Sequence, residues 1–346
     1  MKPLLVTADL TAGALAALDG ELGYEVVDRR GELPGVALGA GAAAGAVGWV
    51  LEAERCGDEE LAALPALGLV ACVRGGPVNV DVDAATRRGI PVLYTPGRNA
   101  ESVADFVIGQ IIALVRHIAH THYLLRSGVL TETRDEQVRA RKDVIWRPAD
   151  PTAPVPYRAF RGPELRTLTL GLLGLGRAGK RVAVKARALD MRVIAHDPFI
   201  AQQDVADVEL VGLDELLSAP DVISLHARGD ATLIGAEQLR AMRPGAFLIN
   251  TARAAILDHG ALLEALRDGH LGGAALDVFP DEPLTPVDPL LALDNVLLTP
   301  HIAGASMNVV DHYSASLVNA LRALHGHGDI RDVSVANPET LAGWKP

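Results

Sequence analysis

The sequence predicts an α/β protein with two doubly wound domains, each built on a parallel sheet. Short apolar runs alternate with helical patterns twice along the 346-residue chain, first in residues 1–100 and again from about residue 167. Such alternation is typical of crossover connections between parallel strands. The chain is also long for a single hydrophobic core. Aromatic residues make up only 4% of it, which suits buried parallel strands rich in Ala, Val, Leu and Ile.

The first alternating series fills residues 1–100. We expect strands at 4–7, 24–27, 46–51, 69–73 and 91–94, and helices at 12–18, 58–64 and 82–88. Gly89 follows the last helix, where glycine commonly ends a helix. Residues 33–51 carry no charge, but five glycines and a proline make them a poor membrane helix. We expect a loop leading into a strand there, and no membrane partner.

The second series has the size of a dinucleotide-binding domain. Its expected strands are 167–173, 192–196, 222–225, 246–250, 273–278 and 296–298, with helices such as 180–189 and 260–267 between them. A helical stretch is expected at about 100–126, with Asn99 as its N-cap. Residues 127–161 then form an arm with six Arg and four Pro. We expect this arm to be an exposed linker or to pack on a partner subunit.

Composition limits the partners and the compartment. The formal net charge of −11 argues against nucleic acid, because phosphate binding needs clustered Lys and Arg. Cys56 and Cys72 are the only cysteines, and neither lies at metal-ligand spacing. We therefore expect no disulfide framework, no metal site and a cytoplasmic location. The first apolar run is too short for a signal peptide.

A glycine motif directly follows the expected strand at 167–173 and opens a helix. Gly174 permits a tight turn, Gly176 lets the backbone approach a pyrophosphate, and Gly179 lets helix and strand pack closely. Arg177 and Ala178 lie at the helix N-terminus, where unpaired amides and the helix dipole attract an anion. The alternative is a tight turn that binds no ligand.

Asp197 favours the dinucleotide over the empty turn. It lies at the end of the next expected strand, about twenty residues after the glycines. A carboxylate there accepts hydrogen bonds from the adenosine ribose and repels the 2′-phosphate of NADP. The sequence therefore predicts NAD as the cofactor.

Three reactive side chains follow the ends of three successive strands. Arg253 follows the strand at 246–250, Glu282 the strand at 273–278, and His301 the strand at 296–298. The carboxyl ends of parallel strands share one edge of the sheet, where ligands bind in open α/β folds. Singly, these residues have ordinary explanations: a surface Arg, a helix-capping Glu and a core His. Together, beside a dinucleotide site, they predict an active site.

These motifs, in this order, resemble the D-isomer-specific 2-hydroxyacid dehydrogenases, a family with phosphoglycerate, glyoxylate/hydroxypyruvate and D-lactate dehydrogenases. The matching stretches are 171–179, 221–226, 249–258, 273–284 and 299–306. The resemblance implies hydride transfer between NAD and a small D-2-hydroxy or 2-keto acid. It also implies a Rossmann-type cofactor domain (101–300) inserted into a flavodoxin-like substrate domain (1–100 and 301–346), with the active cleft between them. The long helix and arm would form a homodimer.

The resemblance also implies roles for the three reactive residues. Arg253 would bind the substrate carboxylate and carbonyl, His301 would be the acid/base, and Glu282 its partner. Chemistry agrees, because hydride transfer to a ketone builds negative charge on oxygen that an imidazolium can neutralise by giving up its proton. A carboxylate partner favours the imidazolium and fixes its tautomer. A guanidinium grips a carboxylate through two parallel hydrogen bonds.

Further cofactor contacts are implied at other strand ends. Asp277 matches the family position that contacts the nicotinamide carboxamide, and Ala252 would supply a nearby backbone carbonyl. The remaining expected cofactor contacts are Thr251, His226, Ala227 and Gly304, besides Arg253 and His301 themselves. Residues 226–230 depart from the common His-x-Pro segment of the family.

Arg74, Gly75 and Gly76 correspond to a glycine-containing loop of the family's substrate domain. Consecutive backbone amides there can form an anion nest for the substrate carboxylate. The alternative is a simple strand-to-helix turn.

Two other functions compete with this interpretation. The family contains corepressors that keep the catalytic residues, so an NAD-sensing, non-catalytic scaffold is the main alternative. Formate dehydrogenases share the scaffold but pair the active histidine with glutamine, whereas Glu282 favours proton transfer. Among substrates, glyoxylate, hydroxypyruvate and a sugar-derived acid stay open. Phosphoglycerate is disfavoured because no second basic cluster is evident for its phosphate.

Overall fold

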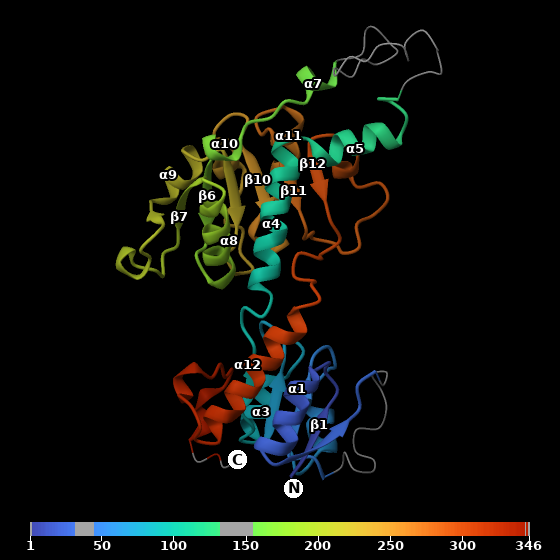
Figure 1. Ribbon diagram of the computed structural model, residues 1–346, viewed down its shortest axis with the longest axis vertical. Coiled ribbons are helices and arrows are strands. Elements are labelled where there is room, and N and C mark those ends of the chain that lie inside the picture. Colours follow the sequence, from blue (N-terminus) through green and yellow to red (C-terminus); the bar gives the residue numbers. More distant parts are fainter. Residues whose placement is uncertain (1, 32–44, 132–154, 343, 345–346) are drawn as a thin grey trace. The chain divides into compact units, whose positions relative to one another are not determined.

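The computed structural model describes residues 2–31, 45–131, 155–342 and 344. The chain divides into two compact units, unit 1 (Met1–Asn99 and Ala305–Pro346) and unit 2 (Ala100–Gly304) (Figure 1). Each unit has one sheet in which all paired strands are parallel. The α/β class expected from the sequence is confirmed. By this division His301 and Gly304 belong to unit 2.

Unit 1 has the strand order of a flavodoxin-like sheet. Its strands are β1 (Lys2–Val6), β2 (Tyr24–Asp28), β3 (Gly48–Leu51), β4 (Leu69–Cys72) and β5 (Val92–Tyr94). Their spatial order is β2-β1-β3-β4-β5. This is a doubly wound order, in which successive strands are added first on one side of β1 and then on the other. All five expected strands are present within one or two residues of their expected bounds. Residues 32–44 of the expected loop lie outside the described residues.

The helices of unit 1 cover both faces of this sheet. They are α1 (Ala12–Ala16, continued by a π-helical turn at Ala17–Glu21), α2 (Asp58–Ala63), α3 (Val82–Arg87) and α12 (Val309–Leu324). α1 and α12 pack in one apolar cluster with β1 and β4, and α2 and α3 pack in a second cluster. Asp81 begins α3 by accepting a hydrogen bond from the Ala84 amide at 2.8 Å.

Unit 2 has the larger sheet, with seven strands. They are β6 (Thr169–Leu173), β7 (Arg192–His196), β8 (Glu209–Leu210), β9 (Val222–Leu225), β10 (Phe247–Asn250), β11 (Gly273–Leu276) and β12 (Val296–Leu298). The order is β12-β11-β10-β9-β6-β7-β8, which reverses between β6 and β9 as in a Rossmann domain. The sequence predicts six of these strands, and β8 is an addition at the edge.

Helices lie on both faces of the unit 2 sheet. They are α4 (Ala100–Val115), α5 (Ile118–Arg126), α7 (Pro156–Ala159), α8 (Arg177–Ala188), α9 (Leu213–Ser218), α10 (Ala236–Ala241) and α11 (His259–Arg267). α4 and α8 share one core cluster with the sheet, and α9, α10 and α11 share the other (Figure 1). Lys185 of α8 also connects α8 to α4 through ion pairs with Glu101 and Asp105.

The described chain also has short 3-10 turns. They lie at Leu165–Thr167, Gln202–Asp204, Ala254–Ile256, Pro289–Ala292, Ile330–Asp332 and Pro338–Leu341.

The helical stretch expected at about 100–126 is helical but forms two helices, because the chain breaks between α4 and α5. His117 adopts a left-handed backbone with φ of 54°, and the two helices are bent by 65°. Gly162 packs into this break so closely that a Cβ there would collide with the carbonyl oxygen of Val115. The expected arm lies partly outside the described residues, at 132–154.

No single helix in the described ranges is long and apolar enough to cross a membrane, although α4 and α5 together meet that length and composition.

Candidate active site

The expected site residues of unit 2 follow the carboxyl ends of its strands. The glycine turn follows β6, Asp197 follows β7, and His226 follows β9. Thr251 follows β10 and Asp277 follows β11. These strands flank the point where the strand order reverses, which is the usual ligand site of a doubly wound sheet.

The glycine turn has the geometry that its sequence predicts. Gly174 adopts φ of 94°, and a Cβ there would lie 2.7 Å from the amide nitrogen of Ala227. A Cβ on Gly179 would collide with the carbonyl oxygen of Gly174. Gly176, by contrast, begins α8 and has no described atom within 4 Å of an added Cβ. The turn therefore packs tightly on two sides and stays open beside the helix N-terminus.

Asp197 is tied to this turn. Its Oδ2 accepts a hydrogen bond from the Leu175 amide at 2.7 Å, and its Oδ1 accepts one from the Phe199 amide at 3.0 Å. The side chain is half-buried. An ionised carboxylate has about four acceptor positions, so two stay available for ribose hydroxyls.

His226 supports the turn from the neighbouring strand. Its backbone carbonyl carbon would lie 2.8 Å from a Cβ on Gly174. Its Nε2 lies 2.9 Å from the hydroxyl of Ser224, which is fully buried in β9. Burial lowers the pKa of His226 to about 4. The imidazole is therefore neutral at pH 7.

Asn250 shapes the turn that carries Arg253. Its buried amide accepts a hydrogen bond from the Ala252 backbone at 3.0 Å and donates one to the Arg253 carbonyl at 2.9 Å. The exposed Arg253 donates from Nη1 to the Ala252 carbonyl at 2.7 Å. Thr251 is buried, and no described group bonds its hydroxyl. A buried hydroxyl without a partner is costly, so this atom is suited to a ligand contact.

Asp277 anchors the segment that carries His301. The carboxylate is fully buried and accepts hydrogen bonds from the Thr299 hydroxyl at 2.6 Å, the Ile302 amide at 2.9 Å and the Ala303 amide at 2.7 Å. These three donors surround His301 in sequence. Three hydrogen bonds compensate a buried charge, and they fix the backbone on both sides of the histidine.

His301 and Glu282 form a close pair. Nδ1 of His301 lies 2.7 Å from Oε2 of Glu282, and Oε1 of Glu282 accepts from the Phe279 amide at 3.0 Å. His301 adopts a left-handed backbone with φ of 55°, which is uncommon for a residue other than glycine. The anchoring by Asp277 supports this conformation.

The charge on Glu282 is stabilised by its neighbours. Burial opposes ionisation, but the hydrogen bonds from His301 and Phe279, with the positive fields of His301 and Arg253, outweigh it. The pKa of Glu282 is therefore lower than its ordinary value. Arg253 and His301 are thus each close enough to Glu282 to interact with its charge.

Two supporting residues had no assigned role in the sequence. Thr299 stands directly after the half-buried strand β12, and Asn250 ends the largely buried strand β10, so their positions at strand ends were visible in the sequence. Their hydrogen bonds were not visible in the sequence. The Thr299 bond joins two side chains that are 22 residues apart, and the Asn250 bonds depend on the conformation of the 250–253 turn. Gly304 lies just beyond the anchored segment and is half-buried.

The Arg74–Gly76 loop belongs to unit 1 and follows β4. The Arg74 carbonyl accepts hydrogen bonds from the amide and hydroxyl of Thr95, at 2.8 and 3.2 Å. Among the described residues, no group accepts a hydrogen bond from the amides of Gly75 or Gly76, and none pairs with the Arg74 side chain. The loop therefore presents two amides and one cation to an anion.

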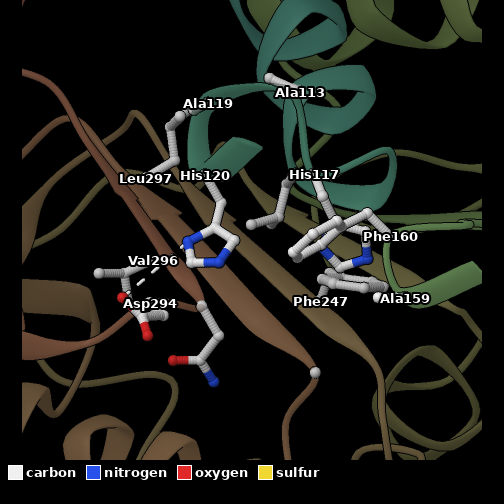
Figure 2. Close-up of a pocket in the computed structure, with 13 residues that line it drawn as sticks. Ala113, His117, Ala119, His120, Ala159, Phe160, Phe247, Asp294, Val296 and Leu297 are labelled. Carbon is white, nitrogen blue, oxygen red and sulfur yellow. Dashed lines mark ion pairs between the residues drawn. The ribbon is translucent and has the colours of Figure 1, made fainter. Parts of the chain in front are cut away.

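A separate pocket lies at the opposite edge of the unit 2 sheet. Figure 2 shows His117, His120 and Phe160 around it, with Asp294 facing His120. Nδ1 of His120 lies 3.9 Å from Oδ1 of Asp294. The strand residues that line this pocket include Phe247 and Val296, which begin β10 and β12. The residues of the candidate active site instead follow the carboxyl ends of the strands. This pocket is not part of the candidate active site.

The residues present fit a nicotinamide dinucleotide. The open side of Gly176, the helix N-terminus behind it and the unpaired Thr251 hydroxyl are each places for such a group. Within the described ranges, no three His, Cys, Asp or Glu side chains gather as a metal site.

Residues 108–303 match the family model described as "D-isomer specific 2-hydroxyacid dehydrogenase, NAD binding domain". The chain belongs to this family. It is 37% identical over 308 residues to a glyoxylate reductase of Aeropyrum pernix, covering 88% of this chain and 87% of that protein. It is 36% identical over 336 residues to the (S)-sulfolactate dehydrogenase of Chromohalobacter salexigens, covering 94% and 99%.

A solved relative has the same fold. The NADPH-dependent glyoxylate/hydroxypyruvate reductase of Sinorhizobium meliloti superposes with a TM-score of 0.71 at 28% identity, over 94% of this chain and 95% of that one. The 2-hydroxyacid dehydrogenase resemblance in the sequence is therefore confirmed. The chain is an oxidoreductase that acts on a CH–OH group and binds a nicotinamide cofactor.

Proposed function

We propose that this enzyme interconverts a small D-2-hydroxy acid and its 2-keto acid, with NAD as the cofactor. The observation that carries the proposal is the pair of His301 and Glu282, joined at 2.7 Å beside Arg253. The bond to Glu282 occupies Nδ1 and leaves Nε2 as the ring nitrogen that can exchange a proton with substrate.

His301, Glu282 and Arg253 each have a distinct role in this proposal. When bound, the nicotinamide cofactor supplies or accepts the hydride. His301 donates a proton to the ketone oxygen during reduction and removes it during oxidation. Glu282 stabilises the imidazolium and fixes the ring. Arg253 binds the substrate carboxylate through its planar guanidinium.

We assign the cofactor to the glycine turn and the strand ends beside it in unit 2. Gly174, Gly176 and Gly179 with Arg177 and Ala178 would hold the pyrophosphate, and Asp197 the ribose. The other proposed contacts are His226, Ala227, Thr251, Ala252, Arg253, Asp277, His301 and Gly304. The preference for NAD rests on the charge of Asp197.

The Arg74–Gly76 loop of unit 1 is the second part of the proposal, as a binding loop for the substrate carboxylate. Its unpaired amides and cation support that role. On this assignment unit 1 is the substrate domain and unit 2 the cofactor domain. Glyoxylate, hydroxypyruvate, a sugar-derived acid and sulfolactate are the substrates to compare, the last because a relative covering 94% of the chain acts on it.

We further propose a cytoplasmic homodimer. Exposed apolar side chains gather on α5 and the segments beside it, and such a surface commonly marks a protein contact. They are Ile118, Tyr123, Leu125, Val129 and Tyr157.

The test is a panel of 2-keto acids assayed with NADH and NADPH. We expect at least one keto acid to be reduced, and a His301→Asn variant to lose about 100-fold or more in kcat while NADH affinity changes much less than kcat. A His312→Asn variant at an exposed position is the matched control. Binding of NADH without turnover of any keto acid would instead favour the non-catalytic scaffold.

A further inference from the structure

The Arg74–Gly76 loop of unit 1, proposed above to bind the substrate carboxylate, is held at both ends. At its start, Val73 donates from its amide to the Leu51 carbonyl at 2.9 Å, and the Arg74 carbonyl is bonded by Thr95. At its end, Asn79 donates from Nδ2 to the carbonyls of Glu52 at 3.1 Å and Glu54 at 2.6 Å. Between these ends, no described group accepts a hydrogen bond from the amide of Gly75 or Gly76. The direction of these two amides is therefore set by how the two ends of the loop are held.

Arg98 makes the remaining contact at the start of the loop. Its Nη1 donates to the Val73 carbonyl at 2.7 Å and to Oε1 of Glu52 at 2.5 Å. Its guanidinium carbon lies 5.2 Å from the centre of the Tyr313 ring, within the range of a cation–π contact. The side chain is only 17% exposed. Arg98 is therefore a half-buried cation paired with Glu52, and not a free surface charge.

Glu52 joins the two ends of the loop. Its carboxylate binds Arg98 at the start, and its backbone carbonyl binds Asn79 at the end. Burial, followed by the negative charge of Glu52, raises the pKa of Tyr313, whose hydroxyl also hydrogen-bonds that carboxylate. Tyr313 therefore stays protonated and presents a neutral ring to Arg98. The segments that follow β3, β4 and β5 meet α12 in this network.

We propose that Arg98 is a positioning residue for substrate binding, which fixes the direction of the Gly75 and Gly76 amides by holding Val73 against Glu52. Arg98 itself does not bind the substrate. Its charge is paired with Glu52, and its Nη1 donates to both Val73 and Glu52. Successive backbone amides bind an anion well only when they point to the same place. If Val73 at the start of the loop is held less firmly, anion binding weakens although the charge of the loop is unchanged.

This inference rests on the proposed function, because it treats the loop as the carboxylate-binding element. It adds a residue that contacts neither the substrate nor the cofactor. Its effect should fall on binding of the keto acid, since the acid/base pair and the cofactor residues belong to unit 2. The expected pattern is a change in KM for the keto acid with little change in kcat.

Three variants separate positioning from general stability. Arg98→Met removes both donors, and Arg98→Lys keeps the charge and can restore one bond. The matched control is Asn337→Ala, because Asn337 is a buried polar residue of the same unit that bonds Ile90, Val92 and Thr86 but none of the loop residues. All three are measured in the full-length enzyme for unfolding midpoint, for KM and kcat with one keto acid, and for amide hydrogen exchange of residues 73–80.

We expect Arg98→Met to raise KM for the keto acid about 10-fold, with kcat and KM for NADH within about threefold of wild type. Exchange at residues 73–80 should become faster, and Arg98→Lys should recover part of both effects. Asn337→Ala should lower the unfolding midpoint without changing that KM or that exchange. An Arg98→Met enzyme with unchanged KM and unchanged exchange would overturn the proposal, as would an equal rise of KM in Asn337→Ala.

The exchange measurement needs no activity. If wild-type protein reduced no keto acid, the proposed function would fail. Faster exchange at residues 73–80 in Arg98→Met alone would then still show that Arg98 holds the loop, and unchanged exchange would show that it does not.

Discussion

Nδ1 of His301 lies 2.7 Å from Oε2 of Glu282, and the other oxygen of that carboxylate accepts the Phe279 amide at 3.0 Å. The carboxylate is thus held at both oxygens and cannot rotate away from the ring without losing a hydrogen bond. Asp277 fixes the backbone on both sides of His301. The imidazole is therefore oriented by one carboxylate and positioned by another.

The charge of Glu282 should matter more than its shape. Glu282→Gln keeps a hydrogen-bonding side chain but removes the charge that stabilises the imidazolium. We expect kcat for keto-acid reduction to fall about 10- to 100-fold. The pH at which reduction is half-maximal should move to lower values, because the proton donor is then easier to deprotonate. The measurement is kcat/KM against pH for the wild type and the variant.

An exposed carboxylate of the same unit provides the control for this change. Glu237→Gln lies on the surface of α10 and should leave both kcat and the pH profile as in the wild type. An identical pH profile in Glu282→Gln and wild type would remove Glu282 from the proton transfer.

Arg253 should act through its geometry as well as its charge. Arg253→Lys keeps the positive charge but loses the planar pair of donors, so we expect KM for the keto acid to rise about 10-fold or more. NADH binding should change less than the KM for the keto acid, because lysine keeps the positive charge. Arg240→Lys is the matched control, because Arg240 pairs with Asp268 at the surface, at 2.6 Å. Unchanged steady-state constants in Arg253→Lys would show that Arg253 does not hold the substrate carboxylate.

Asp197 should set the choice between NADH and NADPH, but it also holds the glycine turn. Two like charges about 4 Å apart repel by about 4 kcal/mol at an effective dielectric constant near 20. Asp197→Asn removes the charge and keeps an acceptor for the Leu175 amide, so the kcat/KM ratio of NADPH to NADH should rise at least about 10-fold. Asp197→Ala should raise the same ratio and weaken both cofactors, because the bond to Leu175 is lost.

Both outcomes are measured with one keto acid and both cofactors. A wild type that prefers NADPH, as the solved Sinorhizobium meliloti relative does by its name, would contradict the assignment to NAD. So would an unchanged preference ratio in Asp197→Asn.

The parts of the fold that the sequence predicted depend on local rules. Gly174 needs a positive φ and Gly179 a close backbone approach, and only glycine satisfies both, so the motif identifies the turn. Arg253 and Glu282 were predicted as site residues because each follows a buried strand. β8 was missed because two residues are too few to show a periodicity.

The other differences come from contacts between distant residues. No glycine or proline stands at His117 to mark the break between α4 and α5, and the close partner of that break is Gly162. Arg98 lies in a turn, and its partners Glu52, Val73 and Tyr313 come from three other places in the chain. Nothing near Arg98 in the sequence indicates that it is half-buried and paired with Glu52.

His226 should make the stability of the enzyme depend on pH. Burial lowers its pKa to about 4 in the folded protein, from an ordinary value of 6.5. Between these values the unfolded chain binds a proton that the folded chain does not. Stability should therefore fall as the pH drops from about 6.5 to about 4, and change no further below that through this residue. At pH 5 the loss amounts to about 2 kcal/mol at most.

A His226→Asn variant tests this, because asparagine can still hydrogen-bond Ser224 but does not titrate. Its stability at pH 7 can be lower than that of the wild type, so the comparison is the change in unfolding free energy between pH 7 and pH 5. We expect the wild type to lose about 1 to 2 kcal/mol more than the variant over this interval, measured by denaturant unfolding. His312→Asn, at an exposed position, should behave as the wild type does. Equal losses in the wild type and His226→Asn would show that His226 is not held neutral by the fold.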